Sequence, residues 1–256
     1  MNKRYLKRNM GYPFPNIKIK VYPKTFLKDV HIGMLFPEVP LSDDLQKSAG
    51  EFFAAEFGLP KIKMEEMPKA VSIFSNAREI SFAFGLSRAD LIIKREAYRS
   101  FADIQDLLNK FFRFLSALGL NYVTKLIFSK YNELGYEAQE GFPVSKVMID
   151  VFSKDLLTSM TPNDIETQKD LTRWEKVVHS EGNDETDSFF TIEYGFRKLP
   201  IEKGRSSLTL KTIIESRNEK ITTKDLPSTM LYYNQILDNA FHWCVSNKVL
   251  KAMREG

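Results

Sequence analysis

The sequence has one cysteine, no glycine-rich nucleotide loop and no long apolar run. Cys244 has no second cysteine to pair with, and no Cys or His lies near it at metal-ligand spacing, which excludes a disulfide scaffold and a zinc ribbon. None of the 12 glycines belongs to a GxGxxG, GxxxxGKS/T or GxSxG arrangement. The sequence therefore does not support a phosphate-cradling loop or a serine-hydrolase elbow, and we expect no cofactor, no metal and no catalytic residues.

Long hydrophobic segments are also missing. No apolar run approaches the ~20 residues that a membrane-spanning helix needs. The first residues, MNKRYLKRNMGYPFPN, lack the apolar stretch of a secretory signal. Together with the single cysteine, these absences predict a cytoplasmic protein that does not enter a membrane.

The apolar content that is present predicts a folded globule. Hydrophobic residues make up 43% of the 256 residues, and 20 of them are phenylalanine. That much apolar surface can offset the entropy lost when the chain becomes ordered. The length allows one large domain or two closely joined halves.

Positive charge is concentrated at the start of the chain. Residues 1–24 contain seven Lys or Arg and no acid, so removing them from the net charge of +4 leaves the rest at −3. Three prolines in this arm disfavour a helix. The arm is a candidate nucleic-acid-binding segment, whose candidate residues are Lys3, Arg4, Lys7, Arg8, Lys18 and Lys20. Its aromatic residues, Tyr5, Tyr12, Phe14 and Tyr22, could stack on bases. The alternative is a solvated terminus, or one that lies along the globule.

The sequence pattern of residues 25–119 predicts a first half made of strands and two helices. Alternation predicts a strand over 25–36, and three short strands over 70–75, 78–85 and 90–96 have the spacing of a β-meander. A helix over 44–57 begins at Ser42 or Asp43 and ends at Gly58. A second helix, with an apolar stripe, runs from Ser100 to Gly119.

Residues 120–256 repeat this order. The patterns predict strands over 121–131 and 143–152, a short turn of helix over 155–160, and a second meander over 172–180, 188–197 and 207–216. The acidic stretch 181–187 forms its first turn. One long helix, starting at Pro227 and Ser228, closes the chain. The fold class is therefore α+β, with antiparallel β-meanders packed against long amphipathic helices and an internal duplication of the two halves.

Polar residues give only weak candidates for chemistry. The three histidines are scattered along the sequence, and each fits a surface or packing role. A site could assemble across the second meander from Arg173, His179, Glu193 and Arg197. Glu193 and Arg197 share a face of a strand, but ion pairing on a sheet surface explains that equally well. Cys244 fits a small core hydrophobe.

Two segments carry a resemblance. The segment LNYVTKLIFSKYNEL (120–134) resembles the hallmark strand of a sporadically distributed, uncharacterised prokaryotic protein family. The segment MLYYNQILDNAFHWCVSNKVLKAM (230–253) resembles the closing helix of that family. Asn121 stands where the family has arginine, and Asn234 where it has histidine. The resemblance implies a duplicated sheet-plus-helix layout similar to the SecB-like chaperone fold, and an accessory or partner-binding role beside defence genes or mobile elements.

These observations favour a non-enzymatic protein-binding or adaptor component, acting in a prokaryotic defence or toxin-linked system, over an enzyme. The partner would be another protein or a second copy of the chain, recognised through a sheet edge or an apolar groove. A nucleic-acid-binding accessory that uses the basic arm is the alternative.

Overall fold

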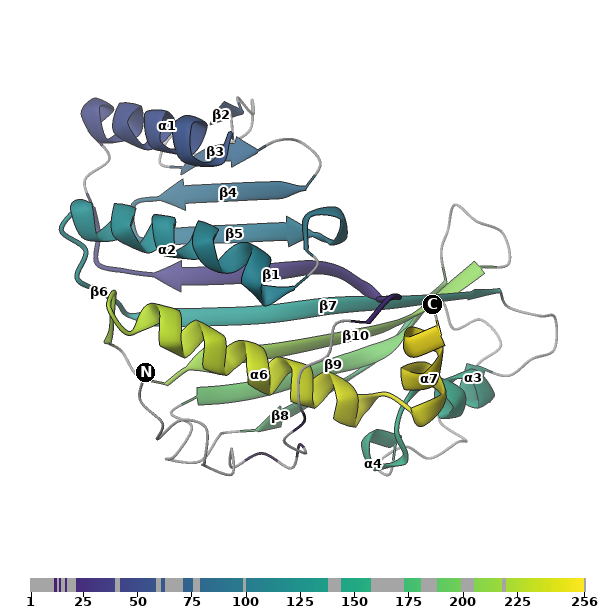
Figure 1. Cartoon of the computed structure of the whole chain (residues 1–256). Coiled ribbons are helices and arrows are strands. Elements are labelled where there is room, and N and C mark those ends of the chain that lie inside the picture. Colours follow the sequence, from purple (N-terminus) through teal and green to yellow (C-terminus); the bar gives the residue numbers. More distant parts are fainter. Residues whose placement is uncertain are drawn as a thin grey trace.

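A nine-stranded antiparallel sheet forms the centre of the computed structural model (Figure 1). The structure describes residues 12, 14, 17, 22–39, 42–58, 61–62, 71–75, 79–98, 100–137, 144–157, 173–180, 188–198, 205–217 and 220–255. Across the sheet the strands are β2 (Lys61–Ile62), β3 (Val71–Ser75), β4 (Ile80–Gly85), β5 (Arg88–Lys94), β1 (Leu27–Leu35), β7 (Lys125–Glu137), β10 (Arg205–Ser216), β9 (Ser188–Lys198) and β8 (Arg173–Ser180). A separate pair joins β6 (Tyr122–Val123) to β11 (Ile221–Thr222).

The helices pack on one face of this sheet. They are α1 (Asp43–Phe57), α2 (Phe101–Ala117), α3 (Val144–Val151), α4 (Lys154–Leu157), α6 (Leu226–Cys244) and α7 (Asn247–Glu255), with a 3-10 turn η1 (Arg95–Ala97) before α2. In Figure 1, α2 lies across β5 and β1, and α6 lies across β10 and β9. The predicted α+β class is therefore confirmed. None of the described helices is long and apolar enough to cross a membrane.

Local sequence signals set the ends of α1 as expected. Ser42 is the N-cap, and its hydroxyl accepts a hydrogen bond from the amide of Leu45 at 3.2 Å. Gly58 ends the helix with φ of 62°, a left-handed conformation in which glycine avoids the strain that a Cβ would cause. Both predicted meanders and the helix between Ser100 and Gly119 are also confirmed.

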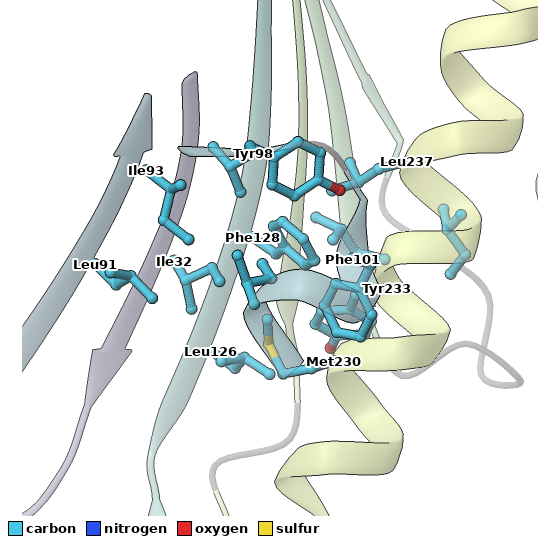
Figure 2. Packing of buried hydrophobic residues seen from close by; sticks show 14 of the residues in the cluster. Ile32, Leu91, Ile93, Tyr98, Phe101, Leu126, Phe128, Met230, Tyr233 and Leu237 are labelled. Atoms are coloured by element: carbon cyan, nitrogen blue, oxygen red, sulfur yellow. The ribbon is translucent and has the colours of Figure 1, made fainter. Parts of the chain in front are cut away.

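Side-chain alternation along the strands builds the core. On β1, Val30, Ile32 and Met34 point to the helices and are fully buried. Figure 2 shows residues of β1, β5 and β7 meeting Tyr98, Phe101 and the α6 side chains Met230, Tyr233 and Leu237 in one space between sheet and helix. The opposite face carries the ion pairs Lys211–Glu193 and Lys125–Glu215 and the hydrogen-bonded pair His31–Asp90.

The two halves of the chain meet at the pairing of β1 with β7. Both are central strands of one continuous sheet, and each has the last strand of its own meander, β5 or β10, on its other side. Each half thus runs central strand, helix, three-stranded meander, long helix. An internal duplication would explain this matching order, and it stays a prediction.

The predicted strand over 143–152 is wrong, because Val144–Val151 form α3. The β-branched valines and isoleucine favour a strand, but Val147, Met148 and Val151 fall at helical spacing and pack inward. Ile149 points outward and is 57% exposed.

The prediction of one long helix at the end of the chain is also wrong, because two helices, α6 and α7, occupy this region. The chain is extended at Val245, with φ of −98° and ψ of 152°, where it bridges to Phe152. Ser246 then caps α7 by accepting a hydrogen bond from the amide of Val249 at 3.4 Å. A β-branched residue followed by a serine provides the signal for this break.

Candidate functional site

A pocket lies between the helix layer and the centre of the sheet. We call it the central pocket. It holds about 740 Å³ and is lined by residues that precede β1, by η1, by the start of α2 and by β7, α6 and α7. This volume falls within the range of ligand pockets, roughly 300–1,000 Å³. Its apolar wall contains Leu27, Phe101, Leu231, Phe241 and Met253.

An ion pair forms the polar base of the central pocket. Lys130 projects from β7 into the helix layer and is 5% exposed. Its Nζ lies 2.5 Å from Oδ1 of Asp238 on α6, and 5.6 Å from the centre of the Tyr98 ring. Burial opposes the charged ammonium, but the Asp238 carboxylate and the Tyr98 hydroxyl outweigh it, so the pKa of Lys130 is raised. Lys130 is therefore a cation at neutral pH.

Two further polar groups connect to this pair. Asn234, one helical turn before Asp238, donates from Nδ2 to Oδ2 of Asp238 at 3.1 Å. The Tyr98 hydroxyl donates to Oδ1 of Asn234 at 3.4 Å. Asn234 is 1% exposed, so both oxygens of the Asp238 carboxylate have a partner inside the protein. The fixed amide and carboxylate orient Lys130 toward α6.

His242 is held as a neutral imidazole at the rim. Its Nδ1 lies 2.7 Å from the carbonyl oxygen of Asp238, which can only accept, so Nδ1 carries the proton. Nε2 accepts a hydrogen bond from the hydroxyl of Tyr22 at 2.6 Å. Burial lowers the pKa of His242; Lys130 and Arg254 act in the same direction, while the bond to Asp238 opposes them.

Acidification should reveal the protonation state of His242. Because burial lowers the pKa of His242 below its ordinary value of 6.5, the unfolded chain takes up this proton before the folded protein does. The contribution of His242 is therefore fully present above about pH 6.5. It is lost between the unfolded and folded pKa values, at a rate of at most about 1.4 kcal/mol per pH unit. Urea unfolding at pH 7.5 and 5.5 should show a smaller loss for His242→Gln than for the wild type. An equal loss in both proteins would contradict this assignment.

The buried titratable groups of the central pocket are engaged in hydrogen bonds. Lys130 is protonated, Asp238 is paired, and both ring nitrogens of His242 are engaged. At the rim, the charges of Arg95 and Glu96 add one cation and one anion to the buried pair. The lining is thus neutral overall and accommodates an uncharged apolar group. Within the described ranges, no group of three His, Cys, Asp or Glu could hold a metal ion.

A second feature lies at the end of the sheet, on β8. This strand has eight residues and pairs with β9 on one side, and it has no other strand partner in the described part of the chain. Val177 is 60% exposed and Val178 is 38% exposed. Because neighbouring residues of a strand point to opposite faces, this edge carries one exposed valine on each face, next to the charged residues Glu175 and Lys176.

The two polar residues of the second meander whose side chains are described, His179 and Glu193, each have a partner on the surface of the sheet. His179 is exposed and its Nδ1 lies 2.8 Å from the Thr191 hydroxyl across β8 and β9. Glu193 lies 3.5 Å from Nζ of Lys211 on β10. The backbones of Arg173 and Arg197 face each other in the β8–β9 register, while their side chains are outside the described part. Glu193 is thus one member of an ordinary sheet-surface ion pair.

The candidate nucleic-acid residues Lys3, Arg4, Lys7, Arg8, Lys18 and Lys20 lie outside the described residues, as does the acidic stretch 181–187. Three aromatic residues of the arm are described, and all three lie on the globule. Tyr12 and Phe14 stack on each other and pack at an angle against Phe190, and the Tyr22 hydroxyl is hydrogen-bonded to His242. These rings are engaged in packing, which agrees with an arm that lies along the globule.

Sequence patterns missed the central pocket, although one signal was present. On β7, every second residue from Leu126 to Leu134 faces the helices, and Lys130 and Asn132 fall in this buried set. A lysine in register with buried apolar residues indicates a paired internal charge. The paired acid, Asp238, lies on the buried side of a helix far along the sequence. Asn234, at the position of the resembled family's histidine, belongs to the same cluster, whereas Asn121 is exposed.

No protein-family model and no curated protein matches the chain. The resemblance to a sporadically distributed prokaryotic family stays a prediction. The chemistry of the described residues therefore carries the functional argument.

Proposed function

We propose that the protein is a non-enzymatic protein-binding component that takes up an extended segment of a partner along β8. The observation that carries this proposal is the pair of exposed valines on that edge, Val177 at 60% and Val178 at 38%. An edge strand can pair with a strand of another molecule. Addition of a partner strand beside β8 would cover one exposed valine on each face of the sheet.

Edge strands of soluble proteins are normally protected by charges, prolines, bulges or short length. The other end of the sheet follows this rule, because β2 has two residues. By contrast, β8 has eight residues, its register with β9 is regular, and two exposed valines lie beside the charged residues Glu175 and Lys176. The length of this edge and its exposed valine pair favour a partner surface there.

The mutual pairing in the central pocket supports the non-enzymatic part of the proposal. A general base needs an available lone pair near the operating pH. The ammonium of Lys130 has none at neutral pH, and Nε2 of His242 accepts from Tyr22. These residues fit a structural role or the binding of an apolar group better than proton transfer.

Lysines placed on the edge should abolish partner capture. In the variant Val177→Lys/Val178→Lys, two cations would have to be buried against the incoming strand, which opposes pairing. We expect the amount of the main co-purifying protein to fall at least about tenfold, which corresponds to about 1.4 kcal/mol of binding free energy. Tagged protein purified from its native host and analysed by mass spectrometry measures this amount.

The matched control is Ile149→Lys, because Ile149 is equally exposed, at 57%, but lies on α3. This variant should capture the partner as the wild type does. Equal loss in both variants would indicate a general effect of added charge. Recovery of nucleic acid in place of a protein would reject the edge proposal and direct attention to the basic arm.

A further inference from the structure

The start of the chain is held on α6 as a bound peptide would be. We call the described residues Tyr12, Phe14, Ile17 and Tyr22 the N-terminal strap. The backbone of Ile17 is held at both of its polar groups. Its amide donates to Oδ1 of Asn239 at 3.1 Å, and its carbonyl oxygen accepts from Nε2 of Gln235 at 3.0 Å.

The two side chains of this clamp also orient each other. Nε2 of Gln235 donates to Oδ1 of Asn239 at 2.9 Å, one helical turn away. Asn239 is fully buried with the strap in place, and the bond from Gln235 fixes the orientation of its side chain there. A pair of amide side chains that bonds to one backbone N–H and one backbone C=O recognises an extended segment whatever side chains that segment carries.

Selectivity for side chains comes from an aromatic slot beside the clamp. Phe14 lies 4.8 Å from the Phe190 ring and 5.5 Å from the Trp243 ring, measured between centroids. Tyr12 lies 5.3 Å from Phe190, and its hydroxyl donates to the carbonyl oxygen of Ser188 at 3.0 Å. The slot therefore receives two aromatic rings that are two residues apart in sequence, one of them with a polar tip.

We propose that this surface of α6 and β9 is a recognition site for an extended peptide segment with two aromatic residues at i and i+2, occupied by the N-terminal strap. A covalently attached segment is present at a high effective concentration, in the millimolar range for a short connection. A partner segment of the same chemistry would have to displace the strap. The inference extends the proposed protein-binding function but uses a different surface from β8, so the two can fail separately.

The test measures binding of a fluorescein-labelled synthetic peptide of residues 10–24, MGYPFPNIKIKVYPK, to full-length proteins by fluorescence anisotropy. The wild type, whose site is filled, should bind at least about tenfold more weakly than Tyr12→Ala/Phe14→Ala, whose attached segment has lost its rings. A control peptide that carries alanine in place of Tyr12 and Phe14 should bind neither protein measurably. If the double variant does not fold, Phe14→Ala alone keeps the Tyr12–Ser188 bond and should give an intermediate affinity.

Gln235→Glu in the Tyr12→Ala/Phe14→Ala background tests the clamp. The carboxylate keeps the shape of the amide but replaces its donor with an acceptor, facing the peptide carbonyl. Affinity should fall about fivefold or more. Equal weak binding of the peptide by wild type and double variant would overturn the proposal, as would binding that is insensitive to the aromatic residues or to Gln235→Glu. In either case the strap would be a fixed part of the fold.

Discussion

Replacing Lys130 with methionine should lower the free energy of unfolding by about 3 kcal/mol, the lower end of the 3–5 kcal/mol expected when one partner of a buried ion pair is removed. The lower end applies because the Asp238 side chain keeps 20% of its exposure. Methionine fills the space of the lysine stem, so the loss reflects the unpaired carboxylate rather than a cavity. Urea unfolding at pH 7.5 measures the difference.

Two further variants separate the loss of this buried pair from the general effect of removing a lysine. The double variant Lys130→Met/Asp238→Leu removes both charges and should recover at least about half of the loss, because an apolar pair can replace a buried ion pair at little cost. The matched surface variant Lys211→Met breaks a 3.5 Å pair between side chains that are both 39% exposed. It should cost less than about 1 kcal/mol. Equal losses for Lys130→Met and Lys211→Met would contradict the internal pairing.

The second large effect is expected at Phe128, in the middle of β7. This ring is fully buried and lies 6.2 Å from the Phe101 ring. It fills the junction between the central strands and α2 (Figure 2). Phe128→Ala removes this apolar surface and leaves a cavity, so we expect a loss of about 3–5 kcal/mol. That is a large fraction of the 5–15 kcal/mol typical of a domain.

The matched control for Phe128 is Phe189→Ala. Phe189 lies on the opposite face of the sheet, is partly exposed, and contacts His179 and Arg217. Its truncation should cost about 1 kcal/mol. Comparable losses for the two phenylalanines would mean that the apolar core is not centred on the β1–β7 junction.

Local signals predicted most of the fold. The α1 caps at Ser42 and Gly58, and both meanders, follow from residue types at short spacing. The sequence was misleading where packing outweighs propensity. In α3, β-branched residues adopt a helix because Val147 and Val151 fall on one buried face with Met148. The junction of β1 with β7 joins strands about 100 residues apart in sequence, and no local pattern specifies that pairing.

The candidate sites were less predictable for the same reason. Lys130 and Asp238 are 108 residues apart, and Ile17 and Asn239 are 222 apart. The alternation along β7 indicates that Lys130 is internal, but no local pattern identifies a partner for it or for Ile17. Only the tertiary structure brings these residues together. The meander spacing predicted that β8, β9 and β10 are neighbouring strands, but it did not predict that β8 lies at the end of the sheet or which of its residues stay exposed.

The central claim is that a partner protein adds a strand to β8. Hydrogen–deuterium exchange, with and without the partner captured from the native host, measures this most directly. The account predicts that amides of Arg173–Ser180 exchange more slowly in the complex, while those of β3 and β4 at the other end of the sheet are unchanged. A complex in which the β8 amides exchange as they do in the free protein would contradict it.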